Sequence, residues 1–283
     1  MKNVIVRLNE YVTHASGAEK GIIEFILHDP KIMVGMTIHE CAQRSYTSPS
    51  SVVRLCRKLG FEGFKEFHQS LVYELALLDS DLKEKSKEIT YQDSLHDIIE
   101  KVTSKNILSL ENTAKLMDDA TLQACVNQMM KCRSICLFGM GASLLVAKDA
   151  YLKFLRINKP CIINDDWHAQ LLQARNMMSD DLAIALSYSG MTKEVIECIK
   201  AAKEKGATVI AITRFEDNPL AKLADYNLSV SATEFIFRSG AMSSRIAQLN
   251  IIDILYAAYV NQKYDDSLKQ LKLTHIDKTP NEQ

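Results

Sequence analysis

The sequence LAIALSYSGMT, residues 182–192, decides the fold of this chain. Its first five residues are apolar and predict a buried strand. Beyond it, apolar residues recur at helical spacing between positions 195 and 202, which predicts an amphipathic helix. Residues 187–192, which are mostly polar, therefore form the turn from a parallel strand into the N-terminus of a helix.

Three hydroxyls and a glycine occupy this turn, namely Ser187, Ser189, Thr192 and Gly190. Unpaired backbone N–H groups and the helix dipole favour an anion at a helix N-terminus. The hydroxyls can donate to phosphate oxygens, and the glycine lets the backbone approach the anion. The turn has no P-loop lysine, so a monophosphate ester fits it better than a nucleoside triphosphate. The alternative is an ordinary polar turn that begins its helix with a threonine cap.

A second turn of the same kind, Gly139-Met140-Gly141-Ala142-Ser143, follows a predicted strand at residues 134–138. Gly-x-Gly after a strand is part of the dinucleotide fingerprint, but a leucine holds its third glycine position. Two acids follow the predicted strand 161–163, about where a ribose-binding acid would stand, so a nucleotide stays an alternative. Two such turns at neighbouring strand ends favour a ligand site, because open parallel sheets bind ligands at the carboxyl ends of their strands.

These turns, with Glu234, Arg238-Ser239 and Met242-Ser243 further on, resemble the sugar isomerase (SIS) domain over residues 105–265. The resemblance implies an αβα sandwich with a parallel sheet that binds a phosphorylated sugar. It also implies that the phosphate is bound by the hydroxyls of Ser143, Ser187, Ser189 and Thr192. Glu234 is expected to lie near the sugar. The segment Asp166-Trp167-His168-x-Gln170 is expected to line the same pocket. The expected ligand-binding residues are Gly141, Ala142, Ser143, His168, Ser187, Tyr188, Ser189, Thr192, Glu234 and Arg238.

The N-terminal part of the sequence predicts short helices in succession, without the strand-turn-helix units described above. A helix from Glu19 to Leu27 should end before Pro30. Thr37 and Glu40 form a capping box that opens a short helix, and a brief turn follows. Ser48 then caps a third helix with Pro49 at its first position, and Gly60 ends it. A short helix, a tight turn and a capped second helix have the spacing of a helix-turn-helix.

The outer side of the third helix is basic. Between residues 44 and 65 five basic residues stand against one acid, a local excess suited to a phosphate backbone. The alternative is a solvated basic face on a structural helix. The start of a recognition helix points toward bases and phosphates. We therefore expect the following residues to contact DNA: Ser48, Ser50, Ser51, Arg54, Arg57, Lys58 and Lys65.

Residues 37–71, including LGFEGFKEF at 59–67, resemble the N-terminal domain of RpiR-type regulators, which join this helix-turn-helix to an SIS domain. The sequence therefore predicts an all-α N-terminal domain followed by an α/β domain. The expected boundaries are a DNA-binding domain at 1–78, a linker at 79–104, a sugar-phosphate domain at 105–265 and a tail at 266–283.

Composition fits two folded domains. The chain has 283 residues, of which 47% are hydrophobic, and a net charge of −1, so affinity for nucleic acid must come from a local patch. The seven cysteines form no Cys-x-x-Cys pair, and Cys41, Cys56 and Cys136 lie in apolar patterns that predict burial. The histidines lack zinc-type spacing, and no cofactor is implied. With no apolar signal segment or membrane span, we expect a cytoplasmic protein.

The functional prediction is a transcription regulator whose affinity for a double-stranded DNA operator depends on a bound sugar phosphate. Among such proteins, the chain looks closest to those that sense N-acetylmuramic acid 6-phosphate or an N-acetylhexosamine 6-phosphate. The apolar helix at 241–259 favours a homodimer or higher oligomer. The alternative is a phosphosugar isomerase or lyase with Glu234, His168 or Asp166 as its base. The fused DNA-binding domain argues against an enzyme, so we expect no catalytic residues.

Overall fold

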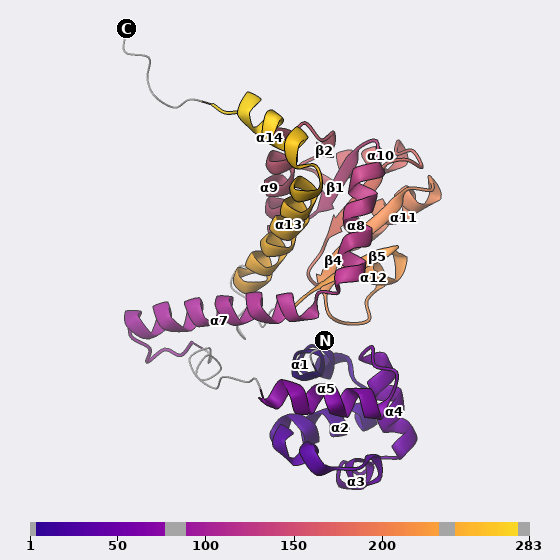
Figure 1. Ribbon diagram of the computed structural model, residues 1–283, viewed down its shortest axis with the longest axis vertical. Helices are drawn as coiled ribbons and strands as arrows, with labels where there is room; N and C mark the ends of the chain where they lie inside the picture. Colours follow the sequence, from indigo (N-terminus) through magenta and orange to yellow (C-terminus); the bar gives the residue numbers. More distant parts are fainter. Residues whose placement is uncertain (1–3, 77–88, 232–240, 277–283) are drawn as a thin grey trace. The chain divides into compact units, whose positions relative to one another are not determined.

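The computed structural model describes residues 4–76, 89–231 and 241–276. The chain divides into two compact units. The first comprises Met1–Met117, Arg214–Asp217 and Ser229–Ala247, and the second comprises Asp118–Thr213, Asn218–Leu228 and Gln248–Gln283. Each unit is described in turn (Figure 1).

The described N-terminal part of the first unit is entirely helical, as predicted. Its elements are α1 (Val4–Tyr11), η1 (Val12–His14), α2 (Gly17–His28), η2 (Pro30–Gly35), α3 (Ile38–Arg44), α4 (Pro49–Lys58) and α5 (Phe64–Ala76). The helix α2 ends before Pro30, as expected. The capping box of Thr37 and Glu40 and the cap of α4 by Ser48 are both present.

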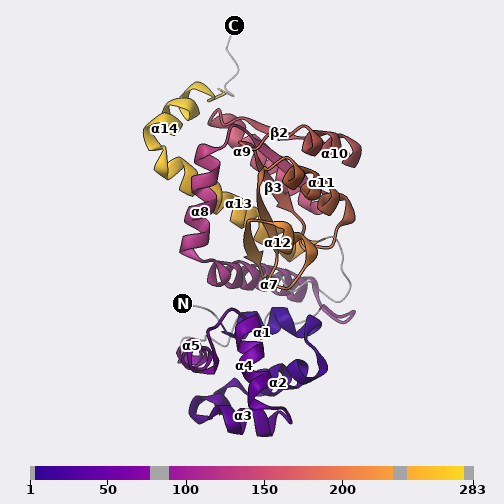
Figure 2. The same ribbon diagram turned by 90° about the vertical axis from the view of Figure 1, so that its right-hand side faces the viewer.

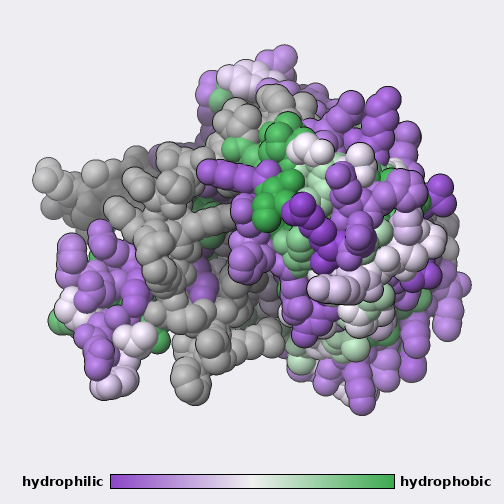
Figure 3. Space-filling model, turned by 90° about the horizontal axis from the view of Figure 1, so that it is seen from below, coloured by the Kyte–Doolittle hydropathy of each residue, from purple (hydrophilic) through white to green (hydrophobic). Residues whose placement is uncertain are grey.

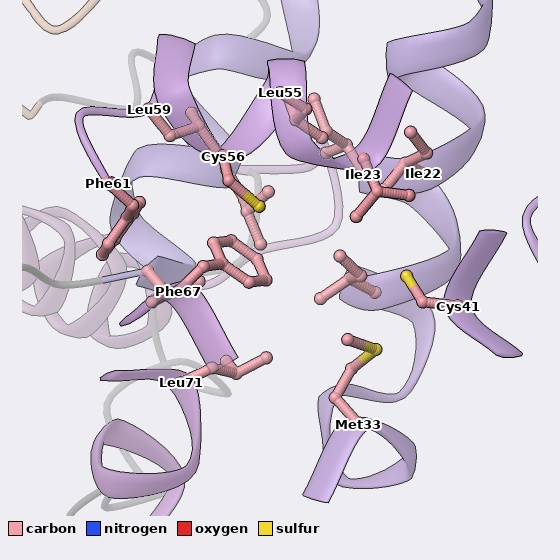
Figure 4. Packing of buried hydrophobic residues seen from close by; sticks show 14 of the residues in the cluster. Ile22, Ile23, Met33, Cys41, Leu55, Cys56, Leu59, Phe61, Phe67 and Leu71 are labelled. Carbon is pink, nitrogen blue, oxygen red and sulfur yellow. The ribbon is translucent and has the colours of Figure 1, made fainter. Parts of the chain in front are cut away.

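A buried apolar cluster holds these helices together (Figure 4). It includes Ile22 and Ile23 of α2, Leu55 and Cys56 of α4, and Phe67 of α5, each 2% exposed or less. The predicted burial of Cys41 is also confirmed, since that side chain is inaccessible. The helix α1 was not predicted, but its side chains join this core, which explains why so short a segment is ordered as a helix.

The turn between α3 and α4 is tight. The Thr47 N–H donates to the Ala42 carbonyl over 2.8 Å, and the Ser45 hydroxyl donates to the Cys41 carbonyl over 2.7 Å. Tyr46 adopts a φ of +54° in this turn, a left-handed conformation that is uncommon for a non-glycine residue. These contacts satisfy the end of α3 and allow α4 to start at Pro49, with four residues between the two helices.

A long helix, α7 (Leu95–Leu116), follows, with Ser94 and Asp97 forming a capping box at its start. It takes in residues 95–104 of the segment expected to be a linker, while residues 79–88 of that segment lie outside the described residues. The apolar residues across this stretch belong to one continuous helix. The helix α8 (Asp119–Lys131) comes next and begins the second unit.

The second unit is built on a five-stranded sheet with the order β2-β1-β3-β4-β5. The strands are β1 (Ile135–Gly139), β2 (Cys161–Ile163), β3 (Leu182–Leu186), β4 (Thr208–Arg214) and β5 (Tyr226–Val230). The pairs β1–β2, β1–β3 and β3–β4 are parallel. The strands predicted at 134–138, 161–163 and 182–186 are confirmed as β1, β2 and β3, to within one residue at each end.

Helices cover both faces of the sheet (Figure 2). The helices of this unit after α8 are α9 (Ala142–Arg156), α10 (Trp167–Arg175), α11 (Lys193–Glu204), α12 (Pro219–Leu223), α13 (Met242–Gln262) and α14 (Tyr264–Leu273). On one face, side chains of α10, α11 and α12 pack with strand residues that include the buried Cys136. The other face meets α9, whose Phe154 ring contacts Tyr256 and Tyr259 of α13. The helix α14 occupies part of the segment 266–283 that we expected to be a tail.

Candidate functional site

The two anion-type turns follow strands that are neighbours in the sheet. Gly139, the last residue of β1, is paired with Leu186, the last residue of β3. The strand order also reverses direction between β1 and β3, because β2 lies beyond β1 while β4 and β5 lie beyond β3. In open α/β sheets a ligand binds at such a switch point, outside the carboxyl ends of the strands. The geometry therefore brings the two predicted turns to one place.

The turn after β3 is held by contacts within its own residues. The Gly190 N–H donates to the Ser187 carbonyl over 3.0 Å, and the Met191 N–H donates to Ser189 Oγ over 3.2 Å. The hydroxyls of Ser187 and Thr192 lie 2.9 Å apart and share one hydrogen bond. Ser187 is only 3% exposed. Two hydroxyls at the beginning and end of the turn are thus fixed side by side.

Gly190 is required at this turn for two reasons. Its φ of +63° lies in the left-handed region, and a Cβ at this position would stand 1.9 Å from Asn218 Oδ1. Asn218 is itself buried and immobilised, because its side chain caps α12 and its amide donates to Thr213 Oγ1 over 3.2 Å. The close approach of Asn218 to Gly190 fixes the backbone of the turn from behind. Sequence reasoning missed Asn218, although Asn-Pro is a recognisable helix start.

Thr192 is the N-cap residue of α11 but its side chain makes no capping hydrogen bond. Gly141 occupies the same position before α9 and has no side chain with which to cap. By contrast, α3, α4, α7, α8, α10 and α12 each begin with a side chain that accepts a backbone N–H. The two helices at the switch point therefore offer their first N–H groups and the positive end of their dipoles to a ligand. The simple threonine cap considered above is not formed.

The turn after β1 is anchored by a buried glutamine. The Gly139 N–H donates to Gln170 Oε1 over 3.2 Å, and Gln170 Nε2 donates back to the Gly139 carbonyl over 3.0 Å. Ser143, in the first turn of α9, is buried and donates to Gln248 Oε1 over 3.1 Å. Gly141 reaches α9 through a φ of +57° with no atom near its missing Cβ. The glycine turn thus presents an open backbone beside a fixed serine.

The structure separates the residues of the segment 166–170. The carboxylate of Asp166 accepts the Ala169 N–H over 3.0 Å and caps α10. His168 is exposed in the first turn of α10, and Gln170 supports β1. Tyr188 and Ala142 are half-buried in the two turns. Glu234 and Arg238 lie outside the described residues.

The candidate DNA-binding residues cluster on α4 and its approach. Ser48, Ser50, Arg54 and Arg57 are exposed, Ser51 is half-buried, and Lys65 is exposed on α5. The Ser48 hydroxyl accepts the Ser51 N–H over 3.2 Å and lies 2.9 Å from Ser50 Oγ. In Figure 3 the described residues seen from below are mostly hydrophilic, with a smaller hydrophobic patch among them. A hydrophilic basic helix start of this kind suits a charged polymer.

Lys58 differs from the two arginines because it pairs with a buried acid. Its Nζ lies 2.7 Å from Glu19 Oε1, and Glu19 is 1% exposed. Burial opposes the ionisation of Glu19, but hydrogen bonds from Lys58 and Ser16 outweigh it and hold the pKa of this carboxyl below its usual range. The hydrogen bond to Glu19 likewise raises the pKa of Lys58. Lys58 therefore serves the fold as well as the surface.

Tyr46 was not among the predicted site residues. It is 98% exposed at the turn before α4, in the left-handed conformation noted above. An exposed aromatic in a strained turn is a candidate contact residue. Its signal in the sequence was weak, because only the fold shows which turn residue points outward.

Within residues 4–76, 89–231 and 241–276, no group of three or more His, Cys, Asp or Glu side chains could hold a metal ion. Burial raises the pKa of the Cys136 thiol to about 11 and that of Cys56 to about 12, so these thiols are protonated and unreactive at neutral pH. No described helix is both long and apolar enough to cross a membrane.

The fold joins a helix-turn-helix to an α/β sheet with a switch point, an arrangement typical of transcriptional regulators. The sequence profile of the SIS domain matches residues 128–258, and that of the rpiR-family helix-turn-helix domain matches residues 2–77. The chain belongs to the RpiR family of HTH-type transcriptional regulators.

Relatives of the same class match almost the whole chain. An HTH-type transcriptional regulator of Caldanaerobacter subterraneus subsp. tengcongensis is 37% identical over 97% of this chain and 96% of its own length. The regulator YbbH of Bacillus subtilis is 34% identical over 93% of this chain and 90% of its own length. The NanR protein of Vibrio vulnificus, solved in complex with ManNAc-6P, has a TM-score of 0.59 and 28% identity over 96% of both chains.

Likeness to more distant structures concerns the fold alone. The sugar isomerase domain of an RpiR transcription factor from Sphaerobacter thermophilus has a TM-score of 0.57 and 20% identity. The match covers 61% of this chain and 95% of the Sphaerobacter domain. The predicted combination of a helix-turn-helix with an SIS domain is confirmed by the two family profiles.

Proposed function

We propose that this regulator binds a double-stranded DNA operator through α4 and that an amino-sugar 6-phosphate bound in the SIS domain sets its DNA affinity. One observation carries the effector half of the proposal. The starts of α9 and α11 lie at neighbouring strand ends, and neither is capped by a side chain. A phosphate monoester would supply the missing acceptor oxygens to these N–H groups and to the hydroxyls around them.

The acetylated amino sugar is supported by the NanR protein, which matches 96% of this chain and was solved with ManNAc-6P. We propose an N-acetylhexosamine 6-phosphate, or N-acetylmuramic acid 6-phosphate, as the effector. The phosphate would lie against Ser187, Ser189, Thr192 and Ser143. Glu234, Arg238 and His168 are proposed to contact the sugar, with Gly141, Ala142 and Tyr188 lining the turns.

The alternative of an isomerase or lyase is less well supported. One of its three candidate bases, Asp166, is engaged as the cap of α10. The relatives that match nearly the whole chain are transcriptional regulators. We therefore propose that the site senses the sugar and leaves it unchanged. Turnover of a phosphosugar that the Glu234→Gln variant abolishes would reverse this choice.

The DNA half of the proposal assigns base and phosphate contacts to Ser48, Ser50, Ser51, Arg54, Arg57, Lys58 and Lys65. A homodimer acting in the cytoplasm would present two copies of α4 to an operator with two half-sites. We propose domain boundaries at 1–78 for DNA binding and 105–265 for the effector, joined by residues 79–104 and followed by residues 266–283. A sugar that binds one dimer arrangement better shifts the population toward it, and DNA affinity changes by the same coupling factor.

The test is a titration of N-acetylmannosamine 6-phosphate into a complex of the protein with a duplex selected for tight binding. The wild-type complex should change its DNA affinity, and the Ser187→Ala/Ser189→Ala variant should bind the duplex but respond only at much higher sugar concentration. Ser179→Ala, an exposed serine of the same unit, is the matched control and should respond like wild type. A double variant that responds at the wild-type concentration contradicts the placement of the phosphate.

A further inference from the structure

Gln248 is a buried amide that only half satisfies its hydrogen-bonding capacity. It lies on α13 and is 1% exposed. Its Oε1 accepts the hydroxyl of Ser143 over 3.1 Å, whereas its Nε2 is buried and has no hydrogen-bond partner among the described residues. A buried amide donor without an acceptor destabilises a fold, so native proteins rarely contain one without a reason.

The packing of α13 against α9 shows where this amide lies. Ser143 contacts Gln248 near the start of both helices, and further along Lys153 pairs with Asp253 over 3.0 Å and Phe154 meets Tyr256. The contacts follow the same order in both helices, so α9 and α13 run side by side in the same direction. Gln248 is therefore next to the first turn of α9, at the carboxyl edge of the sheet where the candidate phosphate site lies.

We propose that Gln248 is a ligand-binding residue whose Nε2 donates a hydrogen bond to an oxygen of the bound phosphosugar. The inference rests on the proposed function and adds a residue to its site. Ser143 holds the planar amide by its Oε1, which fixes the direction of Nε2 one amide width away from a serine of the glycine turn. A donor fixed before the ligand arrives loses little conformational entropy on binding.

A purely structural role explains the observations less well. If Gln248 only joined α9 to α13, its Oε1 alone would make the connecting hydrogen bond. The unpaired Nε2 would then destabilise the fold without contributing any interaction. An apolar side chain of similar length would fill the same space without that cost. A glutamine at this position is explained if its Nε2 donates a hydrogen bond to an oxygen of the ligand, which is present only in the bound state.

The first experiment compares Gln248→Met with wild type, using isothermal titration calorimetry with N-acetylmannosamine 6-phosphate. The variant keeps the length of the side chain and removes its polar atoms. Its melting temperature without sugar should stay close to that of wild type, because removal of the unpaired Nε2 offsets the loss of the acceptor for the Ser143 hydroxyl. Its affinity for the sugar phosphate should fall about tenfold, 1.4 kcal/mol. Gln262→Met is the matched control on the same helix, because the Gln262 amide donates to Gln123 at an exposed position. It should bind like wild type.

A double-mutant cycle separates direct contact from support of Ser143. If Gln248 acted only by holding the Ser143 hydroxyl, the Ser143→Ala/Gln248→Met variant would bind no more weakly than Ser143→Ala alone. We expect the double variant to bind several-fold more weakly than Ser143→Ala. Equal affinities of these two variants overturn the proposal.

The outcomes also separate this inference from the proposed function. Wild-type binding together with wild-type affinity in Gln248→Met overturns the role of Gln248 alone. A wild-type protein that binds neither N-acetylmannosamine 6-phosphate nor inorganic phosphate contradicts both proposals. Should Gln248→Met fail to fold, Gln248→Glu supplies the test, because its carboxylate retains the acceptor for Ser143 and repels a phosphate. That variant should lose at least tenfold in affinity, and unchanged affinity overturns the proposal.

Discussion

The helices α4 and α11 both begin at a hydroxyl residue, yet they use it differently. In α4 the hydroxyl of Ser48 accepts the Ser51 N–H, so the helix start is satisfied by its own sequence. In α11 the hydroxyl of Thr192 turns to Ser187 and leaves the first N–H groups without a side-chain cap. The same residue chemistry stabilises the fold in one unit and remains available to a ligand in the other.

The starts of α4 and α11 therefore differ in whether their N–H groups are satisfied within the protein. The start of α4 is capped by its own Ser48, and its outer arginines are exposed. At the start of α11, Asn218 lies close against Gly190 and is itself held by a hydrogen bond from the Ala221 N–H. An uncapped helix start on a rigid support is suited to an anion, since the binding groups need no rearrangement.

The largest expected effect is on the free energy of unfolding, through the close contact between Gly190 and Asn218. Gly190→Ala should lower the free energy of unfolding by about 4 kcal/mol, because a left-handed φ and a clash with Asn218 are both penalised. Gly206→Ala is the matched control, since Gly206 also has a positive φ but its nearest atom, in Ser179, would be 3.5 Å from a Cβ. Its cost should be about 1–2 kcal/mol. Urea unfolding of the full chain measures both, and equal losses would show that Asn218 does not support the turn.

A smaller effect is expected on the outer face of α4. Arg54→Ala should weaken binding of a selected DNA duplex about tenfold and, for a phosphate contact, reduce the salt dependence by about one unit of slope. Lys58→Ala should instead lower thermal stability, because it leaves the buried Glu19 without its partner. Fluorescence anisotropy across a range of salt concentrations distinguishes them. Unchanged DNA affinity in Arg54→Ala contradicts the assignment of α4 as recognition helix.

The pair of Glu19 and Lys58 also predicts a modest dependence on pH. The pKa of Glu19 is lower in the folded protein than its ordinary value of 4.5, so the stabilisation is complete above that value and is lost as pH falls through the folded pKa. The stability gap between wild type and Glu19→Gln should therefore shrink below about pH 4. Glu24→Gln, an exposed position paired with Lys20 over 3.8 Å, should show almost no gap at any pH. A gap for Glu19→Gln that is constant from pH 3 to 7 would rule out this linkage.

The same contrast explains what the sequence could and could not predict. The caps of Thr37 and Ser48 were predictable because each involves residues three positions apart. The strands and both turns were predictable from apolar runs followed by glycine and hydroxyl residues. The hydrogen bond between Ser143 and Gln248 joins residues 105 positions apart, and the clash that keeps Gly190 a glycine involves Asn218 on another element. Such pairs depend on the packing of the fold and leave no local pattern.

Whether a threonine at a turn caps its helix was likewise beyond local reasoning. A capping threonine and an uncapped one have the same sequence signature, and the neighbouring Ser187 decides between them by taking the Thr192 hydroxyl. The helix α1 escaped prediction for a related reason, since an eight-residue helix is ordered by the core it joins rather than by its own propensity.

The most direct test of the central claim measures two quantities on two variants, Ser48→Ala and Thr192→Ala. The quantities are the free energy of unfolding in urea and the affinity for N-acetylmannosamine 6-phosphate. Ser48→Ala should lose about 1 kcal/mol of stability and bind the sugar phosphate like wild type. Thr192→Ala should stay within about 0.5 kcal/mol of wild-type stability and lose about tenfold in affinity. A Thr192→Ala variant that loses as much stability as Ser48→Ala and binds the sugar phosphate as wild type does would contradict the account.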